Sequence, residues 1–145
     1  QPLVAAEMCH VTLPDAEVRV VSGAFAGVKG PAKTFSPVTV LDATLGAGGA
    51  LPLDFSATST LAVLVMRGEV EVQGQRAVEG DFVLFRRDGE RATFTARTDA
   101  RLLVLNGEPL REPVVQYGPF VMNSEAEIRQ AFIDFSRGAF GHLEE

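Results

Sequence analysis

Residues 61–78, LAVLVMRGEVEVQGQRAV, decide the fold of this chain. Residues 61–66 are apolar throughout, as in a strand that is buried on both faces. Residues 69–72 then alternate strictly between glutamate and valine, so we expect the valines to face a core and the glutamates to face solvent. Gln73-Gly74 favours a hairpin tip before residues 75–78. The stretch therefore predicts short antiparallel strands joined by tight turns.

Segments of the same kind continue on both sides of this stretch. Each is four to eight residues long, rich in β-branched or aromatic residues, and bounded by turn residues. The further predicted strands are residues 18–21, 38–45, 82–85, 92–96 and 101–105. Eight or so strands at regular spacing predict a closed or sandwiched antiparallel β fold.

The pattern changes once, near the C-terminus. Ser124 and Glu127 have the spacing of a helix capping box, and Gly138 is placed to end the helix. Apolar residues follow the box at helical spacing: Ile128, Ala131, Phe132 and Phe135. We therefore expect one amphipathic helix over residues 124–137, with its apolar stripe buried against its own protein. A partner-binding helix is the alternative.

Length, composition and charge exclude several classes of protein. The chain has 145 residues, which is one domain's worth, and its 46% hydrophobic and 22% charged residues are those of a folded protein. The net charge is −6, with no basic run longer than Arg86-Arg87, so we expect no direct contact with nucleic acid. No apolar run approaches the roughly 20 residues of a membrane span. We expect a soluble protein that does not enter a membrane.

The cysteine and arginine content indicates a compartment and a source. Cys9 is the single cysteine, so no internal disulfide can form, and a cytoplasmic location is expected. The basic residues are eleven Arg and two Lys in an Ala-, Val- and Gly-rich background, typical of GC-rich bacterial genomes. The chain begins at Gln1, so we expect a trimmed protein or a piece of a longer one.

Two glycine frames resemble the motifs of cupin barrels. In the first cupin motif a glycine is followed by a His-x-His pair, a glutamate and a second glycine. The residues on this frame here are Gly49, Phe55, Ala57, Leu61 and Gly68, and a frame longer by one residue gives Gly48, Asp54, Ser56, Leu61 and Gly68. The second frame begins at Gly80, has Arg86 where a proline usually stands, and puts its histidine position near Arg91 or Ala92. The turns are kept and the ligands are missing.

The missing ligands predict a barrel without a metal. A cupin site needs imidazole nitrogens and a carboxylate that converge on one transition metal. Phe55, Ala57 and Leu61 offer neither. We therefore expect no metal site, no other cofactor and no catalytic residue in this chain.

Three other pairs could carry chemistry. Cys9 and His10 would form a thiol–imidazole couple, but adjacent residues of a strand point to opposite faces. His10 and His142 lie near opposite ends of the chain, which indicates surface residues. Glu69 and Glu71 share one face of a strand and could act as an acid/base pair. Their alternation with valine indicates a solvated face instead.

Two loops remain. Residues 46–49, GAGG, lack the third glycine of a dinucleotide loop and stand between strands, so we interpret them as a turn. Residues 86–91, RRDGER, mix charges around a glycine, as a solvated hairpin loop does. A phosphate or partner patch is the alternative for this second loop.

The last third of the chain carries the most specific resemblance. Residues 107–123, GEPLREPVVQYGPFVMN, closely resemble the end of pirin-family proteins, and Gly23 and Gly27 resemble the entry to the family's second barrel. The resemblance extends through Glu125, Glu127-Ile128, Gln130, Ala131, Phe132, Asp134, Gly138 and Phe140-Gly141.

Pirins are bicupins, and the resemblance implies that this chain is a C-terminal cupin domain. The expected fold is all-β, a cupin-type antiparallel β-barrel or jelly roll with one appended C-terminal helix. We expect an N-terminal arm over residues 1–15 that resembles an inter-domain linker, the barrel over 16–117, and a segment with the helix over 118–145. The family's metal site and its His-Pro-His-Arg-Gly motif belong to the N-terminal cupin, so no ligand can be assigned here.

The resemblance favours a structural and interaction role, in which this barrel supports an N-terminal cupin that carries the metal. The family includes quercetin 2,3-dioxygenase-like members, but we do not expect enzyme activity from this chain alone. Two alternatives stay open: a metal-independent cupin enzyme, and a module that binds an apolar small molecule in a pocket lined by Phe55, Ala57 and Leu61. The expected partners are the N-terminal cupin domain, a second copy of the chain in a homodimer, or that small molecule.

Overall fold

The computed structural model describes residues 8–141 of the chain. These residues form two compact units, one ending at Pro109 and the other beginning at Leu110. The division lies eight residues before the boundary expected from the sequence, because the strand-forming pattern ends at Gly107 and a proline-containing segment follows it. Each unit is described separately.

The first unit is built from short strands with turns between them. Their bounds are β1 Cys9–Leu13, β2 Ala16–Ser22, β3 Ala24–Phe25, β4 Val28–Lys29, β5 Val38–Leu45, β6 Ala50–Asp54, β7 Thr60–Arg67, β8 Glu69–Val72, β9 Gln75–Val78, β10 Phe82–Leu84, β11 Arg91–Ala96 and β12 Ala100–Gly107. The hairpin expected at Gln73-Gly74 is confirmed, since both residues have positive φ and β8 pairs with β9 across them.

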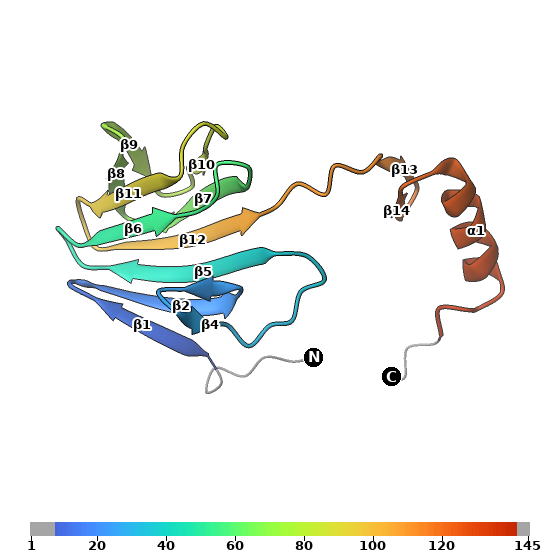
Figure 1. The fold of residues 1–145 in the computed structure, drawn as a ribbon, viewed down its shortest axis with the longest axis horizontal. Coiled ribbons are helices and arrows are strands. Elements are labelled where there is room, and N and C mark those ends of the chain that lie inside the picture. The colour runs from blue at the N-terminus through green and yellow to red at the C-terminus, as the bar shows by residue number, and fades with distance from the viewer. Residues whose placement is uncertain (1–7, 142–145) are drawn as a thin grey trace. The chain divides into compact units, whose positions relative to one another are not determined.

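The strands make two main antiparallel sheets. One has six strands in the order β1-β2-β5-β12-β7-β10, with β5 and β12 at its centre (Figure 1). The other has four strands in the order β6-β11-β8-β9. Strands that neighbour one another in a sheet are often distant in sequence, as β5 and β12 are. The expected antiparallel β-barrel or jelly roll is confirmed.

In most of the longer strands, every second residue lies in the core. In β2 the valines Val18 and Val20 are fully buried while Glu17 is exposed, and β11 alternates in the same way around the buried ring of Phe94. Val70 and Val72 of β8 are buried and their neighbouring glutamates are not, as the sequence predicted. Alternation of this kind is what one buried face requires of a sheet.

Two elements differ from the sequence prediction. Residues 9–13, which we assigned to an N-terminal arm, form edge strand β1 and pair with β2 from Cys9↔Val20 to Leu13↔Ala16. Their half-buried alternation is too weak a signal to read from sequence. Residues 61–66 were expected to be buried on both faces, but within the described chain Leu64 is only half-buried and Met66 is exposed. The described residues therefore cover only part of the face of β7 that carries Leu64 and Met66.

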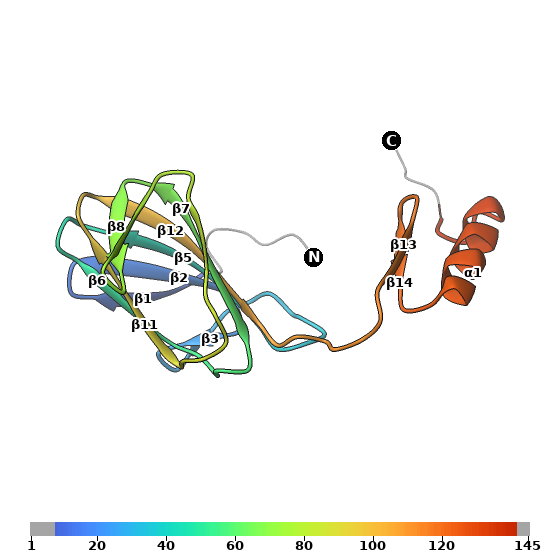
Figure 2. The same ribbon diagram turned by 90° about the horizontal axis from the view of Figure 1, so that it is seen from above.

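The second unit is small. It has a hairpin of β13 Val115–Tyr117 and β14 Phe120–Met122, followed by helix α1 Glu125–Ser136 (Figure 2). The capping box is confirmed, because the Ser124 hydroxyl accepts a hydrogen bond from the Glu127 amide while Glu127 accepts one from the amide of Asn123. Helix α1 has 12 residues, and no helix in the described part of the chain is long and apolar enough to cross a membrane.

The apolar stripe of α1 is only half covered. Ile128 and Ala131 are buried, whereas Phe132 and Phe135 remain 38% and 65% exposed. The ring of Phe120 contacts three phenylalanines, with its centroid 5.0 Å from that of Phe132 in an edge-to-face arrangement. The sequence prediction that this stripe is buried within the chain therefore applies to two of its four residues in the described structure.

Candidate functional site

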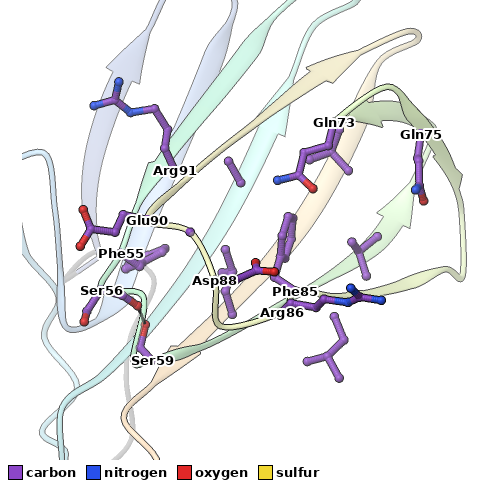
Figure 3. Close-up of a pocket in the computed structure, with 16 residues that line it drawn as sticks. Phe55, Ser56, Ser59, Gln73, Gln75, Phe85, Arg86, Asp88, Glu90 and Arg91 are labelled. Atoms are coloured by element: carbon purple, nitrogen blue, oxygen red, sulfur yellow. Dashed lines mark hydrogen bonds between the residues drawn. The ribbon is translucent and has the colours of Figure 1, made fainter.

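The first unit has a pocket of about 410 Å³ at one end of the two sheets (Figure 3). Its walls come from the residues after β6, the β8–β9 hairpin, β10, and the loop that leads into β11. The apolar lining residues are Phe55, Leu61, Val72, Val83, Leu84, Phe85 and Ala92. The rings of Phe55 and Phe85 lie among polar side chains that include Gln73 and Glu90.

Local backbone bonds hold the two aromatic residues in place. The amide of Phe55 donates to the carbonyl of Glu90 over 2.9 Å, and the amide of Phe85 donates to the carbonyl of Leu61 over 3.0 Å. The ring of Phe85 meets the buried ring of Phe94 edge to face, with centroids 5.9 Å apart. The apolar wall of the pocket is thus continuous with the core.

The cupin frame positions converge on this pocket. Phe55 and Leu61 of the first frame line it, and so do Arg91 and Ala92, where the second frame places its histidine. Ala57 is half-buried but does not line the cavity. Two of the three positions, Phe55 and Leu61, therefore line the pocket, and Ala57 does not.

The frame glycines have a backbone reason to be glycine. Gly68 joins β7 to β8 with φ +80°, and a Cβ there would lie 2.2 Å from the carbonyl oxygen of Asp99. A Cβ on Gly49 would lie 2.4 Å from the carbonyl oxygen of Asp15. Both turns bring two chain segments into backbone contact, which no side chain allows.

The residues at this end of the barrel do not fit a transition metal. Phe55, Leu61 and Ala92 have no donor atoms, and Arg91 is a cation that donates through Nε to Asp54 Oδ1 over 2.7 Å. This hydrogen bond, more than the charge of Asp54, raises the pKa of Arg91 above its usual value. Within residues 8–141, no three His, Cys, Asp or Glu side chains are grouped so that they could hold a metal ion.

The other candidates from the sequence occupy separate surfaces. Glu69 and Glu71 point outward and pair with arginines, Arg76 at 2.6 Å from Glu69 and Arg97 in contact with Glu71. His10 lies 2.5 Å from Glu17, and Cys9 precedes it on the alternate face of β1.

The loops at residues 46–49 and 86–91 lie at a turn and at the pocket wall, respectively. Gly46, Gly48 and Gly49 form the tight turn between β5 and β6, as expected. Residues 86–91 are exposed and supply Arg86, Asp88 and Glu90 to the pocket wall. His142 lies outside the described residues.

Sequence reasoning missed one polar cluster, on the outer face of the six-stranded sheet. Asp42 of β5 accepts two hydrogen bonds of 2.8 Å from Arg101 of β12, and it also contacts Arg19 of β2. The hydrogen bond from Arg101 is the largest of the effects that hold the pKa of Asp42 below its usual value. The three residues occupy outward positions of neighbouring strands, which alternation alone could suggest, but their pairing depends on strand order.

The fold and the site define the class of protein. Two antiparallel sheets around one core, with glycine turns at the first-motif positions and a pocket where a cupin holds its metal, are those of a cupin domain. The family model for "Pirin C-terminal cupin domain" matches residues 40–141. The chain therefore belongs to the pirin family.

Known relatives agree with this family. A Pseudomonas aeruginosa protein named "Putative quercetin 2,3-dioxygenase PA2418" is 45% identical over 97% of this chain and 50% of its own length. Human pirin is 30% identical over 97% of this chain and 50% of its own length. The crystal structure of a quercetin 2,3-dioxygenase from Acinetobacter baumannii matches with TM-score 0.90 and 37% identity, over 99% of this chain and 51% of the other. The chain spans about half the length of the relatives it matches.

Proposed function

We propose that this chain is the metal-free, non-catalytic barrel of a two-cupin protein, and that it supports an N-terminal cupin that carries the metal. The observation that carries the proposal is the lining of the 410 Å³ pocket, where the frame positions hold Phe55 and Leu61 in place of ligands. Phe55 and Leu61 have apolar side chains without donor atoms, so these positions cannot bind a metal.

The family and the relatives support the companion domain. The matching family is defined by a C-terminal cupin, and the relatives continue for another half of their length beyond the match. Two of them are named or described as quercetin 2,3-dioxygenases. In the proposed protein, any such activity belongs to the N-terminal cupin, because oxygen chemistry is carried by a cofactor that this barrel has no residues to bind. A cytoplasmic, bacterial protein is also proposed, from the single cysteine and the composition.

Metal analysis of the purified, tag-free chain tests the metal-free part of the proposal. We expect iron, nickel and zinc well below stoichiometric amounts. Any metal that is still bound should decrease in the control variant His10→Ala, which removes a surface imidazole. Stoichiometric metal that survives His10→Ala would overturn the proposal.

Oxygen uptake with quercetin tests the non-catalytic part. The rate with the chain alone should equal the rate without protein. Turnover that persists after chelation, and that is lost when Leu61 is replaced, would instead favour a metal-independent cupin enzyme.

The pocket itself favours a second function, the binding of an apolar aromatic molecule. Its volume lies in the range of small-molecule sites, and Phe55 and Phe85 offer two ring faces. Titration with quercetin as a fluorescent probe should then saturate, and Phe55→Ala should weaken the binding while Val78→Ala, on the four-stranded sheet, leaves it unchanged. Equal loss in both variants, or no saturation, would exclude this second function.

A further inference from the structure

We propose that the 410 Å³ pocket binds a neutral saccharide, with one pyranose ring stacked on an aromatic side chain and its hydroxyls hydrogen-bonded to the polar side chains around it. The inference goes beyond both proposed functions, because it needs no second domain and because its ligand is not apolar. The polar side chains, here named the polar rim, come from the β8–β9 hairpin and from the loop between β10 and β11. They are Gln73, Gln75, Arg86, Asp88 and Glu90.

The polar rim has hydrogen-bonding capacity that the protein does not use. Within residues 8–141, its five side chains make no hydrogen bond or ion pair with another protein group, and all five residues are exposed. Other polar side chains of the pocket are already paired, since Arg91 donates to Asp54 over 2.7 Å and Ser59 donates to the carbonyl of Ser56 over 2.7 Å. A ligand that displaces water from the polar rim must replace the hydrogen bonds of that water. The polar rim therefore favours a ligand with several hydroxyls over a wholly apolar one.

The polar rim offers donors and acceptors together. The guanidinium of Arg86 only donates, the carboxylates of Asp88 and Glu90 only accept, and the amides of Gln73 and Gln75 do both. A hydroxyl also donates and accepts, so neighbouring hydroxyls of one ligand can bond to each kind of group. The polar rim carries one positive and two negative charges, which gives an anionic ligand no net attraction. These groups fit a neutral polyhydroxylated molecule.

Phe85 supplies the aromatic surface for the ring. Its ring meets that of the buried Phe94 edge to face, with centroids 5.9 Å apart, so it is held against the core while Phe85 itself stays half-buried. A pyranose with equatorial hydroxyls presents C–H bonds on its faces, and these are attracted to the negative face of an aromatic ring. In the view of Figure 3, the ring of Phe85 lies between the ends of Gln73 and Asp88, with Arg86 to one side. A sugar ring stacked there has its hydroxyls directed at the polar rim.

Titration of the ¹⁵N-labelled chain with neutral methyl glycosides tests the proposal. The probes are methyl β-D-glucopyranoside, methyl β-D-galactopyranoside and methyl α-D-mannopyranoside, and binding is followed through the amide chemical shifts in NMR spectra. We expect saturable shifts at the amides of Gln73 and Asp88 with at least one probe. A ligand of about 13 non-hydrogen atoms at the usual binding energy per atom has a Kd on the order of 1 mM.

Two neighbouring arginines provide a matched pair of variants. Arg86 and Arg87 are both exposed, but only Arg86 lines the pocket. Arg86→Ala and Asp88→Ala should each raise the Kd about tenfold, because each removes a charged hydrogen-bonding partner of the ligand. Arg87→Ala should change the Kd by less than about twofold. Since these side chains are exposed and have no partner within the described residues, the spectra of the free variants should otherwise match that of the wild type.

The aromatic surface is tested by a substitution that keeps an apolar side chain. Phe85→Leu retains most of the packing against the core and removes the ring face. We expect a weaker interaction, and the upfield shift of the sugar C–H protons in the complex should disappear with the ring. If Phe85→Leu proves unstable, that upfield shift in the wild-type complex tests the same contact, and its absence overturns the stacking.

The possible results separate this inference from the others. No saturation with any of the three glycosides at about ten times the expected Kd would overturn it, and so would equal Kd values for Arg86→Ala and Arg87→Ala. Glucuronate or glucosamine that binds at least about tenfold more tightly than the glycosides would show an anion or a cation site instead. Saturation with quercetin but not with the glycosides refutes the saccharide and keeps the aromatic ligand. Metal bound by the chain refutes the metal-free function and leaves the sugar titration to be judged by itself.

Discussion

Replacing Gly68 with alanine should cost far more stability than replacing an equally left-handed glycine that has free space around it. Gly68 has φ +80°, and its Cβ would lie 2.2 Å from the Asp99 carbonyl oxygen and 2.9 Å from the Cα of Ala100. Gly74, at the β8–β9 hairpin, has φ +74° and nothing within 4 Å of a Cβ. Both sites carry the strain of positive φ, but only Gly68 carries the clash.

The two contributions can be given magnitudes. Alanine at positive φ costs about 1–2 kcal/mol, partly offset by about 0.4–1 kcal/mol because it restricts the unfolded chain. Forcing β12 away from Gly68 adds about 1–3 kcal/mol, the range for overpacking a tight site. We therefore expect Gly68→Ala to lower the free energy of unfolding by about 2 kcal/mol more than Gly74→Ala does. For a chain of this size, that difference corresponds to roughly 6–8 °C in Tm.

Urea and thermal unfolding of the two variants and of Gly49→Ala measure these effects. Gly49 is not among the positive-φ residues, yet its Cβ would lie 2.4 Å from the Asp15 carbonyl oxygen, so it reports the clash without the strain. The loss of stability in Gly49→Ala should lie between the losses in the other two variants or equal that in Gly68→Ala. Equal costs at Gly68 and Gly74 would refute the reasoning that the frame glycines are fixed by close backbone approach.

Three further predictions concern the ionic cluster, the core and the helix cap. Asp42→Asn should lower stability by about 2 kcal/mol at pH 7, because it weakens the hydrogen bonds from Arg101 and Arg19. The pKa of Asp42 is lower in the folded protein than in the unfolded chain, so its contribution to stability is complete above the unfolded pKa of about 3.9 and is lost as the pH falls through the folded pKa. The free energies of unfolding of variant and wild type, measured in urea, should therefore converge in acid. A difference that stays constant with pH would contradict the pairing. Phe94→Ala removes a fully buried ring and should cost about 3–5 kcal/mol with little change in m; a cost below about 1 kcal/mol would mean that the core lies elsewhere. Ser124→Ala should cost about 1 kcal/mol of local helix stability, seen as faster amide exchange in α1, whereas unchanged exchange would show that the capping box does not stabilise the helix.

The parts of the fold that the sequence predicted are those fixed by local chemistry. Alternation placed the valines of β8 in the core, the Gln73-Gly74 pair located a hairpin, and Ser124 with Glu127 located the start of α1. Each of these signals lies within a few residues, so no knowledge of the rest of the chain is needed.

What depends on strand order could not be predicted. Asp42 and Arg101 are 59 residues apart and meet only because β5 and β12 are neighbours in the sheet. The pocket lining could not be predicted for the same reason, since Phe85 and Gln73 come from a loop and a hairpin that no sequence frame links. Strand β1 was missed because an edge strand with half-buried residues has a weak periodic signal.

The glycines and the metal ligands of a cupin frame have different physical causes. This chain has the glycines without the ligands. Gly49 and Gly68 are required by backbone contacts at Asp15 and Asp99 that exist with or without a metal. The residue at position 55 is constrained by a metal only where one is bound, and here it contributes a phenylalanine to the wall of the pocket. The spacing of the glycines is therefore a signal of the fold, while the side chains between them are the signal of chemistry. This chain keeps the first and lacks the second, so a metal bound in this domain would need ligands outside that frame.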